Sequence, residues 1–90
     1  MIIKLEKAND GIKKWKATFL DGTITNFGSY NMNDYTLTGD KNARRLYKLR
    51  HKKDLDTGDP HRAGYLSYYI LWGDSTDIYK NINNYNKMFF

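Results

Sequence analysis

The chain has 90 residues, which favours one domain over residues 1–90, and its hydrophobic fraction of 40% is sufficient for a core. It contains no cysteine, which excludes disulfides, zinc–thiolate sites and thiol nucleophiles. The longest purely apolar run, Tyr68–Trp72, is far shorter than the roughly 20 residues of a membrane span, and the first residues lack the apolar stretch of a secretory signal. We therefore expect a soluble, intracellular protein without membrane contact.

Residues 1–28 are predicted to form a three-stranded antiparallel β-meander. The three strands cover Ile2–Lys7, Lys14–Leu20 and Thr23–Phe27, and turn signals separate them. Asp21-Gly22 predicts a two-residue type I′ hairpin, because both of its central positions need a positive φ.

This hairpin also predicts a register for the second and third strands. It places Phe19 opposite Ile24 and Ala17 opposite Asn26. Because side chains alternate along a strand, the core face then consists of Trp15, Phe19 and Ile24. The solvent face consists of Lys14, Lys16, Thr18 and Phe27. A polar loop over residues 28–40 follows, and we expect Tyr30 and Tyr35 to pin it to the body of the protein.

A basic helix is predicted over residues 41–53, with Asp40 as its N-cap. One face of this helix is cationic, and the opposite face carries Ala43, Leu46, Tyr47 and Leu49. Arg50 falls in the middle of the apolar face. We expect its side chain either to extend to solvent or to pair with Asp54 or Asp56.

Two further helices are predicted toward the end of the chain. Residues 60–72 are apolar almost all round, with Asp59 as N-cap and Pro60 in the first turn, which is typical of a buried central helix. Residues 75–89 form an amphipathic helix capped by Ser75, with an apolar stripe of Ile78, Ile82, Tyr85 and Phe89. The predicted fold class is therefore α+β: an N-terminal three-stranded antiparallel β-meander followed by three short α-helices.

The positive charge is concentrated in one segment. Residues 41–53 contain seven basic and no acidic residues, whereas the rest of the chain contains eight basic and ten acidic residues. Like charges one helical turn apart repel each other, so either packing or an anionic partner must offset this repulsion. The pattern predicts phosphate binding by Lys41, Arg44, Arg45, Lys48 and Lys52, with additional contacts from Lys14 and Lys16 on the second strand.

Two other groups of residues have both a structural and a functional interpretation. The stripe of Tyr65, Tyr68, Tyr69 and Trp72 is typical of a core, and base stacking is its alternative role. A second group contains histidines and aspartates, the residue types of a nuclease-like metal site: His51, Asp54, Asp56, Asp59 and His61. The spacing of that group matches no known ligand pattern, so we expect no metal, no cofactor and no catalysis.

Several short motifs together resemble a known family. They are Asn26-Phe27-Gly28, Asp34-Tyr35-Thr36, Arg50-His51-Lys52-Lys53, and a helix running from Asp59-Pro60 through Ala63-Gly64 to Leu71-Trp72. This pattern resembles a family of small uncharacterised proteins that nucleocytoplasmic large DNA viruses of protists and algae, the giant viruses, encode. The resemblance implies a viral source and implies no activity.

The predicted function combines the charge pattern with the viral source. We expect a small, basic, non-enzymatic viral protein that binds nucleic acid through phosphate contacts and without strong sequence preference. DNA is the expected nucleic acid. The alternative is a minor structural or adaptor protein of the virion, whose basic helix binds an acidic viral protein. Both roles imply the cytoplasm or viral factory of an infected cell, and the second implies packaging in the virion. The sequence leaves the oligomeric state open.

Overall fold

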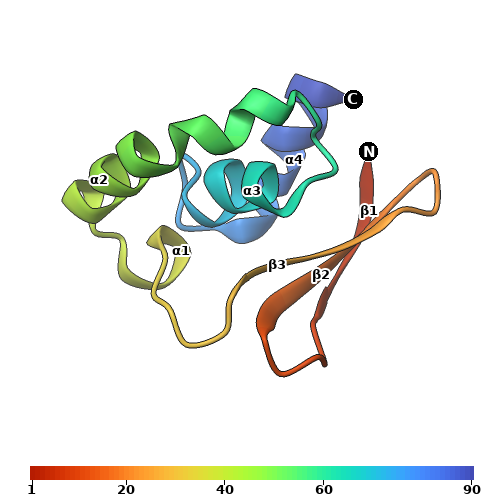
Figure 1. Cartoon of the computed structure of the whole chain (residues 1–90), viewed down its shortest axis with the longest axis horizontal. Helices are drawn as coiled ribbons and strands as arrows, with labels where there is room; N and C mark the ends of the chain where they lie inside the picture. The colour runs from red at the N-terminus through yellow and green to blue at the C-terminus, as the bar shows by residue number, and fades with distance from the viewer.

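A three-stranded antiparallel sheet forms one side of the molecule, and the helices lie on the other (Figure 1). The computed structural model describes all 90 residues. The elements are β1 (Ile2–Lys7), β2 (Lys13–Phe19), β3 (Ile24–Ser29), α1 (Tyr35–Thr38), α2 (Lys41–His51), the 3-10 helix η1 (Lys52–Thr57), α3 (Ala63–Leu66), the π-helix η2 (Ser67–Leu71) and α4 (Ile78–Phe89). None of the helices has the length and hydrophobicity that spanning a membrane requires. The predicted α+β class, with the antiparallel sheet preceding the helices, is confirmed.

The register between β2 and β3 differs from the predicted one by one residue. Ala17 pairs with Thr25 instead of Asn26, so the hairpin loop covers residues 20–22. Within this loop only Gly22 has a positive φ, of 89°. The predicted type I′ turn was wrong because it needs a positive φ at Asp21 as well. A three-residue loop needs that conformation only at its last position, which glycine adopts without steric cost.

This one-residue difference exchanges the two faces of β3. Ile24 lies opposite Thr18 rather than Phe19, and its side chain is 58% exposed. Phe27, which was predicted on the solvent face, is fully buried and pairs with Trp15. Because the side chains of a strand alternate, a slip of one residue moves every side chain to the other face. The core face of the sheet therefore includes Phe27 and excludes Ile24.

One hydrophobic core joins the sheet to α3, η2 and α4. The sheet contributes Ile2, Ala17, Phe19 and Phe27, and the helices contribute Tyr65, Leu66, Ile70, Leu71, Ile82 and Tyr85. Tyr68 is buried as well, while Tyr69 and Trp72 are half-buried against this core. The aromatic stripe is therefore mainly core, and it does not form an open platform for base stacking.

The central helix begins later than predicted. Residues 60–62 form a turn, and α3 starts at Ala63 with Arg62 at the N-cap position. The carbonyls of the first two residues of the predicted helix accept hydrogen bonds from distant side chains. The Tyr85 hydroxyl donates to the Pro60 carbonyl, and the Thr25 hydroxyl donates to the His61 carbonyl. These contacts come from α4 and β3 and hold residues 60 and 61 outside the helix. The local Asp-Pro pattern therefore did not predict where the helix starts.

The second half of this helix is a π-helix rather than the predicted α-helix. The Trp72 N–H donates to the Ser67 carbonyl at 3.0 Å, one residue further back than in an α-helix. Gly73 follows directly, and a Cβ atom there would lie 2.3 Å from the Tyr69 carbonyl oxygen. Position 73 therefore requires glycine, because the Tyr69 backbone lies too close for a side chain.

The C-terminal helix α4 begins at Ile78 rather than at the predicted position 75. Its N-cap is Asp77, whose carboxylate accepts from the Tyr79 N–H at 3.0 Å, whereas the Ser75 hydroxyl accepts from the Asp77 N–H in the preceding turn. The predicted apolar stripe is confirmed: Ile82 and Tyr85 are buried, and both Ile78 and Phe89 pack against the core.

Two asparagines, which the sequence analysis did not single out, connect α4 to the rest of the fold. Asn81 is only 1% exposed; its amide donates to the carbonyls of Ile70 and Ser75 and accepts from the Ser75 N–H. Asn86 accepts from the Ile2 N–H at 2.8 Å and donates to the Ile2 carbonyl at 3.0 Å. Its side chain thereby occupies part of the free edge of β1, where backbone groups otherwise lack partners.

Candidate nucleic-acid interface

The basic helix α2 begins where the sequence predicted. The Asp40 carboxylate accepts from the N–H groups of Asn42 and Ala43, each at 3.0 Å. This cap satisfies two of the backbone donors that the first turn of a helix leaves free. The predicted loop before it contains the short helix α1, capped by Asp34. α2 ends at His51 rather than at residue 53, so Lys52 belongs to the 3-10 helix η1.

Arg44 attaches α2 to the end of the π-helix. Its Nε donates to the carbonyls of Trp72 and Gly73 at 3.1 and 2.8 Å, and its Nη2 lies 2.5 Å from the Asp74 carboxylate. Carbonyls at the end of a helix lack partners within it, and the helix dipole favours a cation there. Arg44 therefore has a structural role, which the prediction of a phosphate contact did not include.

Lys48 lies over two rings of the aromatic stripe. Its Nζ is 4.8 Å from the centre of the Tyr68 ring and 5.9 Å from that of Tyr69, so the ring faces attract the ammonium group. Burial lowers the pKa of Lys48 below its usual value, and the nearby Arg44 charge lowers it further. A bound anion would reverse part of this effect.

A stack of three rings completes the attachment of α2. Tyr47 lies between Trp72, at 4.3 Å and an interplanar angle of 7°, and His51, at 4.1 Å and 19°. Burial raises the pKa of the Tyr47 phenol to about 12, and the Asp54 charge adds to this effect. No residue of α2 is fully buried. Ring stacking of Tyr47 and the contacts of Arg44 and Lys48 therefore hold the helix on the body. Of the predicted apolar face, Ala43 and Tyr47 are half-buried, whereas Leu46 and Leu49 are exposed.

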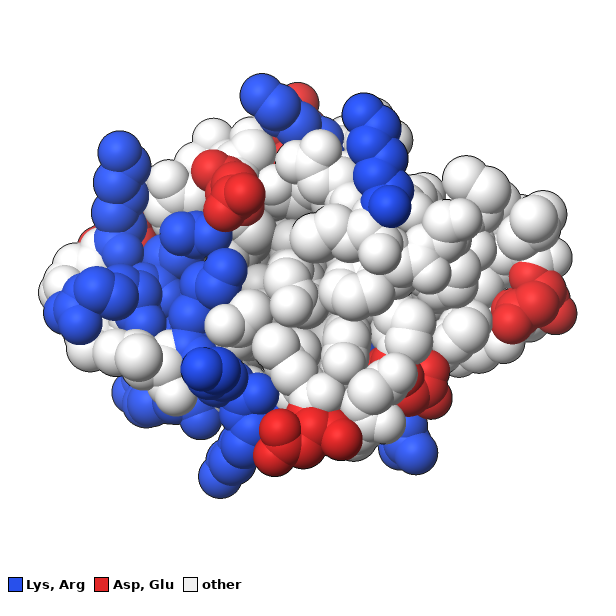
Figure 2. All heavy atoms as spheres, turned by 90° about the horizontal axis from the view of Figure 1, so that it is seen from above, with Lys and Arg blue, Asp and Glu red and all other residues white.

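The cationic hollow is a depression of about 350 Å³ on one flank of α2 and η1. It is lined by Arg44, Arg45, Lys48, Leu49, Lys52 and Tyr68. Four of the five predicted phosphate-binding residues of the helix thus surround one depression, and no carboxylate lines it. The fifth, Lys41, is exposed at the start of α2. Figure 2 shows Lys and Arg gathered at the end of the molecule where Figure 1 places α2.

The two predicted contacts on the sheet have partners within the protein. The Lys14 ammonium group lies 2.7 Å from the buried Asp34 carboxylate, and its side chain is 13% exposed. The Lys16 ammonium group lies 3.5 Å from Glu6. Neither cation belongs to the cationic hollow, and the Lys14 charge is neutralised inside the fold.

Of the two alternatives predicted for Arg50, the structure shows extension to solvent and no pair with Asp54 or Asp56. His51 takes this place, with its Nδ1 at 3.0 Å from Asp54, while Arg50 is exposed and has no carboxylate partner. The sequence already indicated that Arg50 was unusual, because a cation on the apolar face of a helix has no apolar packing role.

The residues of the metal-site alternative are not brought together. His51 pairs with Asp54, whereas His61 lies between Asp59, at 3.1 Å, and Asp21, at 3.3 Å, on opposite sides of its ring. No group of three or more histidine or acidic side chains has an arrangement that could hold a metal ion. These histidines and aspartates therefore do not converge on one point, as a nuclease-like metal site would require.

More than half of the chain matches a protein family. Residues 3–51, which span most of the sheet, α1 and α2, match a family described as "Family of unknown function (DUF5754)". The chain belongs to this family. Comparison with curated proteins and with solved structures gives no match. The family description states neither an activity nor a source, so the viral source and the binding of nucleic acid stay predictions.

Proposed function

We propose that this protein is a non-enzymatic nucleic-acid-binding protein, which contacts the phosphates of DNA at the cationic hollow without strong sequence preference. One observation carries the proposal: four cationic side chains line one hollow that contains no carboxylate. Arg44 is partly compensated by Asp74 and by backbone carbonyls, whereas Arg45 and Lys52 have no carboxylate partner, and phosphates would relieve the remaining repulsion among the four cations. The resemblance to proteins of giant viruses makes viral DNA the proposed partner and the cytoplasm or viral factory the proposed location.

The contacts divide into two groups. Lys41, Arg45 and Lys52 are exposed and free to reach phosphates, whereas Arg44 and Lys48 have contacts within the protein and shape the hollow. Lys14 and Lys16 are not part of the proposed set. Three full phosphate contacts give a slope of about −2.7 for log affinity against log salt on duplex DNA, and five give about −4.5. The measured slope therefore shows how many of the five participate.

The test is fluorescence anisotropy with a labelled random-sequence duplex of about 30 base pairs and its single strand over a salt series. The double variant Arg45→Glu with Lys52→Glu reverses two charges at the hollow. We expect it to lose affinity by roughly tenfold or more, because its side chains change from phosphate contacts to repulsive groups.

The matched control is Lys80→Glu with Lys87→Glu on α4, where both lysines are exposed. It changes the net charge by the same amount, so we expect only a small loss of affinity from the weaker overall field. Equal losses in the two double variants would mean that net charge, rather than the hollow, drives binding. Unchanged affinity in the hollow variant would contradict the proposal.

A specific observation also supports the adaptor role as a second candidate. Leu46 is 42% exposed and Leu49 is 65% exposed on the basic helix. Apolar side chains beside cations suit an acidic protein surface with an apolar centre better than they suit phosphates. Replacing Leu46, which does not line the hollow, with serine leaves DNA affinity unchanged under the first proposal. Binding to purified acidic virion proteins that survives salt sufficient to remove DNA, and that requires Leu46, would favour the adaptor.

A further inference from the structure

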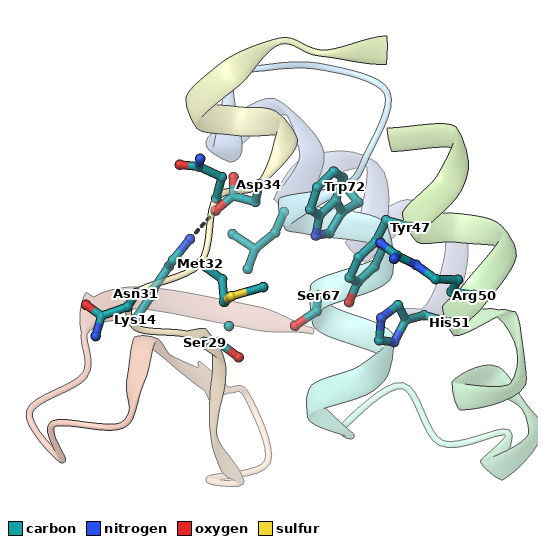
Figure 3. A pocket seen from close by; sticks show the side chains of 13 residues that line it. Lys14, Ser29, Asn31, Met32, Asp34, Tyr47, Arg50, His51, Ser67 and Trp72 are labelled. Atoms are coloured by element: carbon teal, nitrogen blue, oxygen red, sulfur yellow. Dashed lines mark hydrogen bonds and ion pairs between the residues drawn. The ribbon is translucent and has the colours of Figure 1, made fainter. Parts of the chain in front are cut away.

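A second concave site, the cleft between α2 and the loop after β3, is lined by different residues from the cationic hollow. The cleft has a volume of about 520 Å³, which lies in the range of small-molecule sites. Figure 3 shows its three sides: Lys14, Asn31 and Asp34 form one wall, Tyr47, Arg50 and His51 of α2 form the other, and Ser67 and Trp72 lie between them.

Both walls are fixed by contacts outside the open space. On one side, the Asp34 carboxylate binds Lys14 at 2.7 Å and accepts from the Thr36 N–H at 2.9 Å, which holds the end of the loop. On the other side, Tyr47 is stacked between Trp72 and His51. A site whose walls are already ordered loses little conformational entropy when a ligand binds.

The charge of the cleft favours an anion. Lys14 and Asp34 neutralise each other, whereas Arg50 has no carboxylate partner, and the nearby Asp54 pairs with His51. A guanidinium group binds a phosphate through two parallel hydrogen bonds. The free Nε2 of His51 lies on the same wall as Arg50 and offers a further polar contact.

The rest of the lining suits a planar heteroaromatic ring. Met32, Leu71 and Trp72 provide apolar surface, and the exposed Met32 side chain lies in the middle of the cleft (Figure 3). Methionine adapts its shape to a ligand and makes favourable contacts with aromatic rings. No dashed line joins Ser29 or Asn31 to another side chain in Figure 3, so both are available to donors and acceptors at the edge of a base. The Ser67 hydroxyl shares a hydrogen bond with the Tyr47 phenol and keeps capacity for one further contact.

We propose that this cleft binds a nucleoside monophosphate unit, either free or at the end of a nucleic-acid strand. The phosphate lies at Arg50, and the base lies against Met32 and Trp72 with its edge toward Asn31 and Ser67. The π-helix has a role in this site, because its wide turn places Ser67 and Leu71 on the floor of the cleft. The proposal does not depend on binding at the cationic hollow.

The test is a two-dimensional ¹H–¹⁵N NMR titration of the full chain with three probes: adenosine 5′-monophosphate, adenosine and ribose 5-phosphate. We expect the monophosphate to shift the Trp72 indole signal and the amide signals of Asn31 and Ser67. It should bind at least about tenfold more tightly than either fragment, because only the whole unit reaches both Arg50 and the apolar surface. Absence of shifts, or shifts centred on Arg45 and Lys52, would overturn the proposal.

The variant Arg50→Glu removes the proposed phosphate contact and is matched by Lys53→Glu, which changes another exposed cation outside the cleft. We expect Arg50→Glu to weaken binding of the monophosphate by about tenfold or more and Lys53→Glu to leave it within about twofold. Equal weakening in the two variants would refute a specific role of the cleft.

Two further comparisons separate the sources of the ligand and the two sites. One comparison uses a short single strand with a 5′-phosphate. If the strand binds more tightly than the free monophosphate and gives the same shifts, the ligand is a strand end. If the free monophosphate binds more tightly, the ligand is a free nucleotide. The hollow variant Arg45→Glu with Lys52→Glu should retain binding of the monophosphate. Failure of duplex binding therefore leaves the cleft proposal standing, and failure of the monophosphate titration leaves the hollow proposal standing.

Discussion

Arg44 and Arg45 are adjacent cations of the same helix, and the structure predicts opposite consequences for their removal. Arg44 donates to two backbone carbonyls at the end of η2, whereas Arg45 is exposed and contacts only Asn42 of its own helix, at 3.0 Å. Arg44→Ala should therefore destabilise the fold, and Arg45→Ala should weaken binding of DNA without affecting stability.

The magnitude follows from the contacts of each side chain. A hydrogen bond from a charged donor contributes about 1.5–3 kcal/mol to the free energy of unfolding. The ion pair with Asp74 adds less than about 1 kcal/mol, because the Asp74 side chain is 86% exposed. We expect Arg44→Ala to lower the free energy of unfolding by about 2–3 kcal/mol, and Arg45→Ala to change it by less than about 0.5 kcal/mol. For a domain of this size, the first change lowers Tm by roughly 8–20 °C.

The assay is urea and thermal unfolding followed by circular dichroism, combined with the DNA titration at a salt concentration where all variants are folded. Arg44→Lys is the control, since it keeps the charge and loses the planar group that reaches both carbonyls; it should recover only part of the stability. Coincident unfolding curves for Arg44→Ala and Arg45→Ala would refute the structural role of Arg44.

Three further predictions test the register, the end of the π-helix and the burial of Tyr47. Phe27→Ala should lower the free energy of unfolding by about 3–5 kcal/mol and Ile24→Ala by less than about 0.5 kcal/mol in urea unfolding; a larger effect at Ile24 would contradict the observed register. Gly73→Ala should cost roughly 3 kcal/mol or more in thermal unfolding, because the added Cβ would lie 2.3 Å from the Tyr69 carbonyl oxygen and 2.7 Å from Asn81 Cγ; a wild-type Tm would show that the backbone relaxes. Burial raises the pKa of Tyr47 to about 12 in the folded protein from its ordinary value of 10.0, so the unfolded chain loses this proton first as the pH rises. Stability should therefore fall between these two pH values, and Tyr47→Phe should reduce that fall in urea unfolding over a pH series; an unchanged pH dependence would argue against a buried phenol.

Much of the fold could be predicted because its signals are local. Alternation of side chains marked the strands, and the capping residue Asp40 marked the start of α2. The helical spacing of Ile78, Ile82, Tyr85 and Phe89 identified the face on which α4 docks. The concentration of cations in residues 41–53 was likewise visible in the sequence, since counting charges needs no structure.

The local signals failed where two nearly equal alternatives existed. A hairpin with Asp21-Gly22 can form a two- or a three-residue loop, and only packing of Phe27 rather than Ile24 into the core decides between them. The Asp-Pro pair predicted a helix start at residue 60, but the carbonyls of Pro60 and His61 accept from side chains of distant elements. The sequence does not show such contacts, because they join residues that only the completed fold brings together.

The sequence by itself determined the fold class, the strands and the basic segment, whereas the tertiary structure decided which cations are free. Lys14 is neutralised by Asp34, and Arg44 binds carbonyls at the end of η2, while Arg45 and Arg50 remain exposed. Counting charge cannot separate these cases, because the free energy of a cation depends on the carboxylates, carbonyls and rings beside it. Those neighbours come from residues 20 to 30 positions away in the chain, and only folding places them in contact.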